Sequence, residues 1–302
     1  MSWTPRAVAA MLGISPTTLR TWDQRYGLGP TDRTAGGHRR YRDDEVDQLR
    51  RMVALTAQGV APADAARQAR EPGSEHPRRA VVDLTPDAAR AARRGVLTAA
   101  DRLDEPRVRR LAAELIAGHG VVAAWQSVLA PFLVELGDRV SRRGTGVEVE
   151  HLASAGLLHA LRAVPYPEGN GALAALLACA PDEQHSLALE ALGAALSEED
   201  CRWRSLGARV PVPALCDALD RLRPAVTVVW AHHADLAATV PLDDLRRRAD
   251  TVLVAAGPGW DGFDLPDSVR RPTTLSDAVR LIVDQVRVQR SRRSGSSGSD
   301  RP

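Results

Sequence analysis

The first forty-one residues constrain the fold of this chain more than any other stretch. Thr4-Pro5 and Ser15-Pro16 each combine a helix N-capping side chain with a proline suited to the first helical position. Gly13 lies between them, where a glycine can end the first helix in a left-handed conformation. Two short helices joined by a turn that contains glycine predict a helix-turn-helix.

Apolar spacing gives each of these two helices an inner face. The inner residues are Val8, Met11 and Leu12 in the first helix and Leu19, Trp22 and Tyr26 in the second. The outer face of the second helix carries hydroxyl and guanidinium groups, which suit phosphate oxygens and base edges. These outer residues are Thr17, Thr18, Arg20, Thr21 and Arg25, and Asp23 is the exception among them.

Residues 27–41 read as a glycine-hinged basic hairpin, or wing, that follows the second helix. We expect its side chains to contact a nucleic-acid backbone; they are Arg33, His38, Arg39, Arg40 and Tyr41. The alternative is that Trp22, Tyr26 and Tyr41 only fill the core, which is our interpretation of Trp22. The arginines have no such explanation, because many like charges on one small domain repel one another.

The length of 302 residues is too great for one typical domain and suggests two or three. A hydrophobic content of 44% is ample for packed cores, and no uninterrupted apolar run approaches a membrane helix in length. Cys179, Cys201 and Cys216 lie apart without CxxC spacing, which favours reduced thiols and a cytoplasmic protein without a signal peptide.

The predicted fold class is a multidomain α and α/β protein. Residues 1–70 form a winged helix-turn-helix domain, and residues 71–84 form a linker rich in proline and charge. Residues 85–167 form a four-helix bundle, and residues 171–289 form a doubly wound, Rossmann-like domain. Residues 290–302 are rich in serine, glycine and arginine and are expected to be disordered.

Within the bundle, helices are expected at 86–103, 106–117, 121–142 and 147–164, with a kink at Pro131. Within the α/β part, residues 172–180 form a continuous apolar run, as expected of a buried parallel strand. Further strands are expected at 202–206, 225–230 and 251–255 and near Thr273, with intervening helices that include 212–222, 242–248 and 276–288.

The string TLRTWDQRYGL, followed by GGHRRY, resembles the DNA-binding domain of MerR-type transcription regulators. The resemblance implies that the second helix enters the major groove and that the wing arginines and tyrosine contact phosphates. A bundle followed by a sheet with a histidine in its first loop is similar to the cobalamin-binding module of methionine synthase. Together, residues 3–288 resemble the CarH/LitR family of photoreceptor repressors.

This resemblance implies adenosylcobalamin between bundle and sheet, with His185 as the lower axial ligand of cobalt. Glu183 belongs to the same axial loop, Glu150-His151 would cap the adenosyl face, and Gly257 would line the slot for the nucleotide tail of the cofactor. In the family, the dark adenosylated protein is a tetramer on DNA, and light breaks the Co–C bond and releases the promoter.

The match to the cofactor site is partial. Ala188 stands where the axial loop of the family has glycine, and Val140 and Ser141 stand where the upper face has tryptophan and a second ligating histidine. Trp230 replaces the serine that usually ends the third strand, and Ala256-Gly257 replaces a glycine pair. Since the nucleotide tail threads between these two positions, a tryptophan there would partly fill the slot.

Two readings of the function remain open. One is a regulator, presumed a repressor, whose C-terminal module senses adenosylcobalamin or another corrinoid; the other is a cofactor-independent regulator controlled by a protein partner or another ligand. The expected partners are operator DNA and further copies of the chain, as a dimer or tetramer, with no membrane. An enzyme is disfavoured, because there is no Ser/His/Asp triad and Gly257-Pro-Gly259 opens no phosphate-binding helix. His232-His233 at the pocket edge could have a metal or ligand role.

Overall fold

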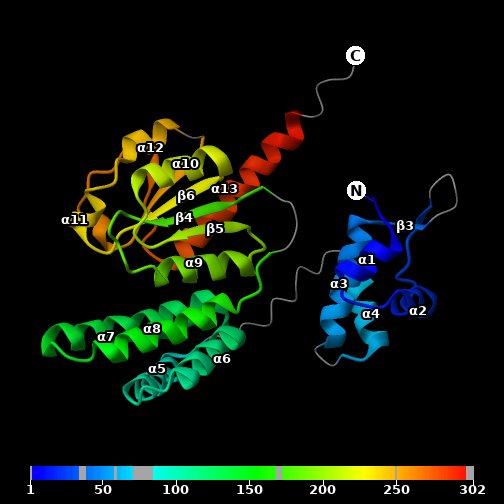
Figure 1. The fold of residues 1–302 in the computed structure, drawn as a ribbon, viewed down its shortest axis with the longest axis horizontal. Coiled ribbons are helices and arrows are strands. Elements are labelled where there is room, and N and C mark those ends of the chain that lie inside the picture. Colours follow the sequence, from blue (N-terminus) through cyan, green and yellow to red (C-terminus); the bar gives the residue numbers. More distant parts are fainter. Residues whose placement is uncertain are drawn as a thin grey trace. The chain divides into compact units, whose positions relative to one another are not determined.

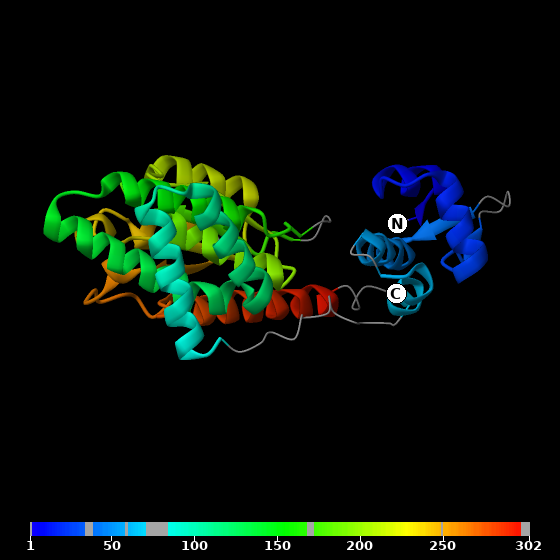
Figure 2. The same cartoon turned by 90° about the horizontal axis from the view of Figure 1, so that it is seen from below.

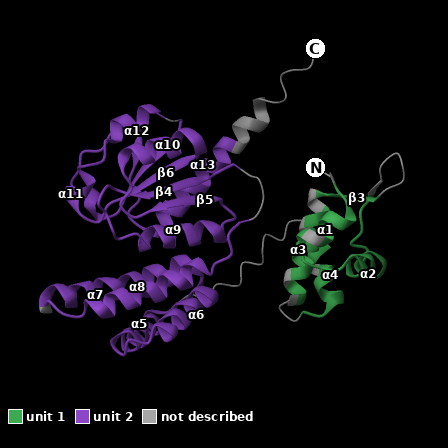
Figure 3. Cartoon of the chain, in the orientation of Figure 1, with its two compact units in different colours: residues 1–78 green, residues 79–302 purple. Residues whose placement is uncertain are grey.

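The computed structural model describes residues 2–33, 39–57, 60–70, 84–167, 172–248 and 250–296. The chain divides into two compact units, residues 1–78 and residues 79–302 (Figure 3). All of the predicted linker except Leu84 lies outside the described residues.

The first unit combines four helices with a small antiparallel sheet, in the part of it that the structure describes. Its elements are β1 (Ser2–Trp3), α1 (Pro5–Met11), α2 (Pro16–Tyr26), β2 (Asp32–Arg33), β3 (Arg39–Arg42), α3 (Asp43–Ala57) and α4 (Pro62–Arg70). The strand order is β1-β3-β2, and Leu19, Leu49 and Met52 are buried at the centre. Met11, which the sequence places on an inner face, is instead 43% exposed, because α1 ends there and turns away from the core.

Helices of the predicted bundle begin the second unit. They are α5 (Pro86–Asp101), α6 (Glu105–Ala124), α7 (Ala130–Arg143) and α8 (Val147–Arg162), with a π-helical turn, η1 (Trp125–Leu129), between α6 and α7. Gly120 interrupts α6 at φ 76° and ψ 162°, a conformation essentially restricted to glycine. This break falls where the sequence separates the second and third helices. The π turn directly precedes Pro131, whose missing N–H removes one helical hydrogen bond.

One helical run of this unit is as long as a membrane-spanning helix. It extends for 38 residues from Glu105 to Arg142 and contains an 18-residue window of mean hydropathy 1.4. Between Leu115 and Val134 this run contains His119, Gln126 and Ser127, so it is not an uninterrupted apolar stretch and does not contradict the prediction from the sequence. Length and composition are weak support for a membrane span, since Val108, Ala112 and Val121 of the run pack in the bundle core.

A five-stranded parallel sheet with helices on both faces completes the second unit. Its strands are β4 (Ala175–Cys179), β5 (Trp203–Gly207), β6 (Val226–Trp230), β7 (Val252–Ala256) and β8 (Val269–Arg270). Its helices are α9 (Leu187–Glu198), α10 (Val212–Leu222), α11 (Ala234–Ala237), α12 (Leu242–Arg248), the 3-10 turn η2 (Pro258–Trp260) and α13 (Leu275–Ser296). The first strand, β4, lies inside the sheet. The chain adds β5 on one side of β4 and then β6, β7 and β8 on the other, so the sheet is doubly wound, as predicted.

The two faces of the sheet have separate cores. Helices α9 and α13 cover one face, where Leu189 and Ile282 are buried in a cluster that continues into the bundle. Helices α10 and α12 cover the other face with Leu219 and Leu245 (Figures 1 and 2). The carboxyl ends of β4 and β6 adjoin at the reversal of strand order, which is where open α/β sheets bind ligands.

Helix α9 connects the sheet to the bundle. It packs against α6 and α8 on one side and against β4, β5 and α13 on the other. The Glu198 carboxylate at its end accepts a hydrogen bond of 3.0 Å from the Val121 N–H, which begins the helix after the Gly120 break. Burial raises the pKa of Glu198. The bundle and the sheet therefore share one continuous core.

Three elements near the carboxyl end differ from the prediction. β8 occupies Val269–Arg270 rather than a position near Thr273, and the four-residue α11 was not expected. α13 continues to Ser296, past the predicted end at Val288 and into the segment expected to be disordered. Arginine and glutamine favour helix intrinsically, so this helix outlasts its apolar stripe. Residues 297–302 lie outside the described part of the chain.

Candidate functional site

The second helix of the helix-turn-helix, α2, has the division of faces that the sequence predicts. The Ser15 side chain caps it by accepting a 2.9 Å hydrogen bond from the Thr18 N–H, and Pro16 occupies the first turn. Leu19 and Trp22 are 2% and 9% exposed and hold the helix to the core. Thr17, Arg20 and Arg25 are exposed on the opposite side. The exposed face of α2 is therefore a row of polar and cationic groups.

Two predicted contact residues on α2 already have partners within the helix. The Thr18 hydroxyl lies 2.8 Å from that of Ser15, and the Thr21 hydroxyl donates a 3.0 Å hydrogen bond to the Thr17 carbonyl oxygen. These contacts fix the two side chains close to the helix surface. Their predicted contact with nucleic acid remains a prediction, whereas Arg20 and Arg25 extend beyond them.

An ion pair joins the wing to α2. The Arg39 guanidinium lies 2.6 Å from the Asp23 carboxylate, the single acid of the helix. β3 pairs with β2 so that Arg33 faces Arg39 and Asp32 faces Arg40. The Arg39–Asp23 pair holds the base of the hairpin beside the exposed face of α2. Sequence reasoning missed this role, because Asp23 stood out only as an exception among cations.

Of the remaining wing residues, Arg40 is half-buried on β3, Tyr41 belongs to the core, and the side chains of the others lie outside the described part of the chain. Tyr41 is only 2% exposed and packs with Trp22 and Leu49. Burial, together with the nearby Asp23 carboxylate, raises the pKa of Tyr41 to about 12. The ring therefore belongs to the core, and the expected contact of Tyr41 with a phosphate stays a prediction. His38 and the Arg33 side chain lie outside the described residues.

Glu45 on α3 fixes the start of the wing and was not identified from the sequence. Its buried carboxylate accepts hydrogen bonds from the Thr31 N–H at 2.8 Å, the Thr31 hydroxyl at 2.7 Å and the Arg42 N–H at 2.7 Å. Burial opposes ionisation, but these donors outweigh it and lower the pKa of Glu45. The carboxylate therefore ties both ends of the hairpin to α3.

Lowering the pH is expected to destabilise the first unit through Glu45. A carboxylate whose pKa is lower in the folded state stabilises the fold above its unfolded pKa, and this contribution disappears as the pH falls through the folded pKa. The free energy of unfolding, measured by denaturant titration between pH 6 and pH 3, should fall more steeply in the wild type than in Glu45→Gln. Parallel pH dependences in the two proteins would contradict this role.

At the carboxyl edge of the sheet, Glu183 and His185 form the geometry expected of an axial-ligand loop. Glu183 is fully buried, and its carboxylate lies 2.7 Å from the His185 Nδ1. It also accepts the N–H of His185 at 2.8 Å and the N–H of His232 at 2.6 Å. Burial raises the pKa of Glu183, but these hydrogen bonds outweigh it, so the pKa is lowered overall.

Ionised Glu183 fixes the tautomer of His185. Because a carboxylate only accepts hydrogen bonds, the Nδ1 that faces it carries a proton, so the neutral imidazole has its lone pair on Nε2. The His185 side chain is 53% exposed, so Nε2 is available at the surface of the loop. A metal-ligating imidazole is typically oriented in this way by a carboxylate on its second nitrogen. The pair therefore fits the lower axial position of a cobalt ion.

The imidazole rings of His232 and His233 lie beside that of His185. The His185 ring centroid is 4.8 Å from that of His232 and 5.8 Å from that of His233. Burial, and then the two neighbouring imidazoles, lower the pKa of His232. Among the described residues, however, no group of three or more His, Cys, Asp or Glu side chains has the arrangement of a metal site.

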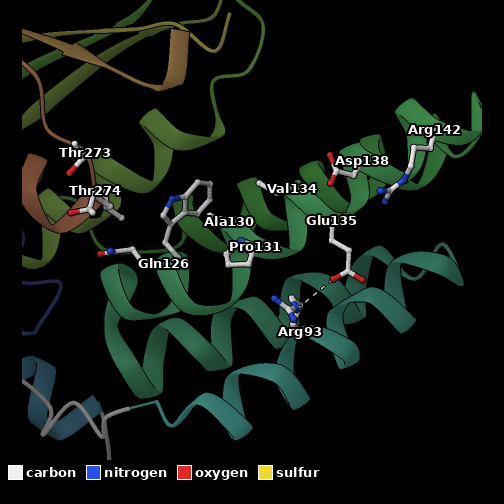
Figure 4. Close-up of a pocket in the computed structure, with 12 residues that line it drawn as sticks. Arg93, Gln126, Ala130, Pro131, Val134, Glu135, Asp138, Arg142, Thr273 and Thr274 are labelled. Atoms are coloured by element: carbon white, nitrogen blue, oxygen red, sulfur yellow. Dashed lines mark ion pairs between the residues drawn. The ribbon is translucent and has the colours of Figure 1, made fainter. Parts of the chain in front are cut away.

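The predicted upper-face pair belongs to the bundle. Glu150 and His151 lie in the first turn of α8, and His151 is exposed. A cleft of about 620 Å³ opens instead between α7 and the loop before α13 (Figure 4). Trp125 and Val134 line its bundle wall, whereas Glu150, His151 and His185 do not line it. The remaining lining residues are Arg93, Gln126, Ala130, Pro131, Glu135, Asp138, Arg142, Thr273, Thr274 and Leu275.

The slot expected to take a nucleotide tail is closed by Trp230. A Cβ placed on Gly257 would lie 3.0 Å from Cε3 and 3.1 Å from Cδ2 of the Trp230 ring, so the ring rests on this glycine. Trp230 also packs against the core cluster shared by the sheet and the bundle. The loop thus fits a cobalt ligand, whereas the slot does not fit a cobalamin whose nucleotide is threaded into the domain.

Comparison with known proteins agrees with this two-part organisation. Residues 4–71 match the MerR HTH regulatory protein family, and residues 92–164 match a B12 binding domain family. The chain is 33% identical over 229 residues to the HTH-type transcriptional repressor CarH of Myxococcus xanthus, which covers 72% of this chain and 74% of CarH. It is 33% identical over 265 residues to the repressor CarA of the same organism, covering 84% and 86%. The monomethylamine corrinoid protein of Methanosarcina barkeri aligns with a TM-score of 0.49 and 12% identity, over 65% of this chain and 99% of that protein.

The fold and the exposed face of α2 with its wing define a DNA-binding transcription regulator of the MerR type, and not an enzyme. Its second unit contains a module of the cobalamin-binding class. The chain belongs to the family of MerR-type regulators that includes CarH and CarA. The predicted family and fold class are thereby confirmed.

Proposed function

We propose that this protein is a cytoplasmic repressor that binds operator DNA as a homo-oligomer. The observation that carries the proposal is the capped α2, whose inner residues are buried while Thr17, Arg20 and Arg25 are exposed. Guanidinium groups on such a helix suit guanine edges and phosphates in the major groove. The relatives CarH and CarA, both named as repressors, support the direction of regulation.

We further propose that the second unit controls this binding through a corrinoid at His185. When bound there, the corrinoid would supply a cobalt centre, and His185 would be its protein ligand. Glu183 holds the imidazole so that Nε2 faces outward, at the edge of the sheet where β4 and β6 end. Self-association is assigned to this unit, because the fourth helix of the first unit, α4, ends at Arg70 with no long pairing helix in the described residues.

An adenosyl-dependent light response is not part of this proposal. The upper-face tryptophan and histidine of the family correspond to Val140 and Ser141. A Cβ placed on Gly146 would lie 3.6 Å from Cγ2 of Val140, so Val140 is directed into the turn before α8. A cofactor-independent regulator is the second candidate, and the closure of the slot by Trp230 is the observation that favours it.

Salt dependence tests the proposed contact between the wing and DNA. The affinity of the full chain for duplexes from its own promoter region should fall as salt rises, by a slope of roughly 0.9 per neutralised phosphate in a log–log plot. Arg40→Ala should reduce that slope by about one. Arg90→Ala, an exposed arginine of α5 in the other unit, is the matched control. A slope unchanged in Arg40→Ala would remove Arg40 from the interface.

A further inference from the structure

We propose that the C-terminal module selects an incomplete corrinoid, one that has the corrin ring and cobalt but lacks the lower nucleotide. The inference rests on the proposed corrinoid function of His185 and specifies the ligand class for that site. It combines two features of the same sheet edge, namely the exposed side chain of His185 and the Trp230 ring that lies against Gly257. Trp230 is the residue that determines this specificity.

Trp230 occupies the central position of the edge. It ends β6 and is paired in register with Cys179 of β4 and Ala256 of β7. A group that enters between this position and the loop at Gly257 meets the indole ring. A serine there would leave a space of several heavy atoms, whereas an indole fills it.

The neighbouring loop packs against the indole of Trp230. Gly257, directly after β7, has φ 104°, and its missing Cβ is what allows the Trp230 ring to lie against it. The Gly259 N–H donates a 3.0 Å hydrogen bond to the Ala231 carbonyl, which pins the loop to the end of β6. The partly buried ring therefore lies between the β7 loop and the core cluster that includes Ala256.

The indole of Trp230 occupies space by packing and is not held in place by a hydrogen bond. Its Nε1 is buried and has no hydrogen-bond partner, which is unusual for a buried N–H. By contrast, the buried Trp260 donates its Nε1–H to the Val229 carbonyl at 3.2 Å. Packing alone holds Trp230, so the property that excludes a threaded nucleotide is the volume of its ring.

The part of this sheet edge that carries His185 is exposed. The His185 side chain is 53% exposed, and Glu183 directs its Nε2 away from the buried carboxylate. When a histidine displaces the lower base of a complete cobalamin, the freed nucleotide needs a place in the protein or must stay in solvent. A corrinoid that lacks this nucleotide has no such group to place, so we expect this sheet edge to bind it more tightly.

The test is a spectrophotometric titration of the full chain with aquacobinamide and, separately, with aquacobalamin. We expect the wild type to bind cobinamide at least about tenfold more tightly, which is roughly 1.4 kcal/mol. Trp230→Ser should bring the two affinities within about threefold by admitting the nucleotide. Trp230→Phe, which keeps a ring but removes the N–H, should retain the preference, and His185→Ala should lose the spectral shift of cobalt ligation.

Equal affinities in the wild type would overturn the inference, and so would an unchanged preference in a folded Trp230→Ser. Circular dichroism establishes whether that variant is folded; if it is not, Trp230→Leu makes the same comparison with a smaller apolar side chain. Failure of the wild type to bind either compound would also overturn it. Duplex binding, measured on the same samples, then shows whether the DNA-binding function stands independently.

Discussion

Replacing Arg20 and Arg25 together with alanine is expected to weaken operator binding by roughly 30-fold or more, because each guanidinium that contacts a base contributes about 1–3 kcal/mol. Both side chains are exposed on α2, whose register is fixed by the buried Leu19 and Trp22. The measurement is fluorescence anisotropy of a labelled promoter duplex at fixed salt. The loss should be greater for the specific duplex than for a scrambled one, since base contacts carry the sequence information.

Arg67→Ala provides the matched control within the same unit. Arg67 lies on α4, its side chain is 69% exposed, and it pairs with Asp64 at 2.6 Å. Its removal lowers the net charge by the same amount per residue but leaves the face of α2 intact. If Arg67→Ala weakened binding as much as either α2 variant, the effect would be one of overall charge, and α2 would lose its assignment.

The sequence predicts the DNA-binding head well because its signals are local. A cap and a proline at Ser15-Pro16 determine where α2 begins, and Gly27 ends it in a left-handed conformation. The apolar spacing of Leu19 and Trp22 determines which face is buried. The same kind of signal separates the bundle helices at Gly120, where the backbone departs from helix.

The features that the sequence did not predict depend on contacts between distant residues. Tyr41 and Arg39 lie two positions apart on one strand, and only the packing of β3 shows that the first is core and the second pairs with Asp23. Glu45 reaches Thr31 across fourteen positions of sequence. Such pairings have no period or cap to reveal them, so they emerge only from the folded chain.

The predicted cofactor site at the sheet edge also depends on contacts between distant residues. The position of His185 after a buried strand predicts its place at the sheet edge, and the family resemblance adds Glu183, which lies 2.7 Å from the His185 Nδ1. The predicted meeting of that loop with Glu150-His151 depends on the relative placement of bundle and sheet, and none of these residues lines the cleft beside α7. Spacing along the chain defines a loop, whereas a pocket depends on how two layers pack.

The largest loss of stability is expected from Gly257→Ala. Gly257 has φ 104° and ψ 164°, a region essentially restricted to glycine, and an added Cβ would lie 2.3 Å from the Ala231 carbonyl oxygen. Backbone strain alone costs about 1–3 kcal/mol. The clash with a main-chain atom of the neighbouring strand end adds to it, because neither backbone can move without opening the sheet edge. We therefore expect a loss of about 3 kcal/mol or more in the free energy of unfolding, within the range of severe single substitutions.

Denaturant titration followed by circular dichroism measures that loss, and Gly95→Ala is its control. Gly95 lies within α5, and a Cβ there would meet nothing within 4 Å. The control should stabilise the unit by about 0.5–1 kcal/mol, since alanine favours helix and restricts the unfolded chain. The two substitutions add the same methyl group, so opposite signs would assign the effect at Gly257 to its backbone conformation. A Gly257→Ala protein as stable as the wild type would mean that the β7 loop can relax, and the Trp230 ring with it, so the closed slot would no longer follow.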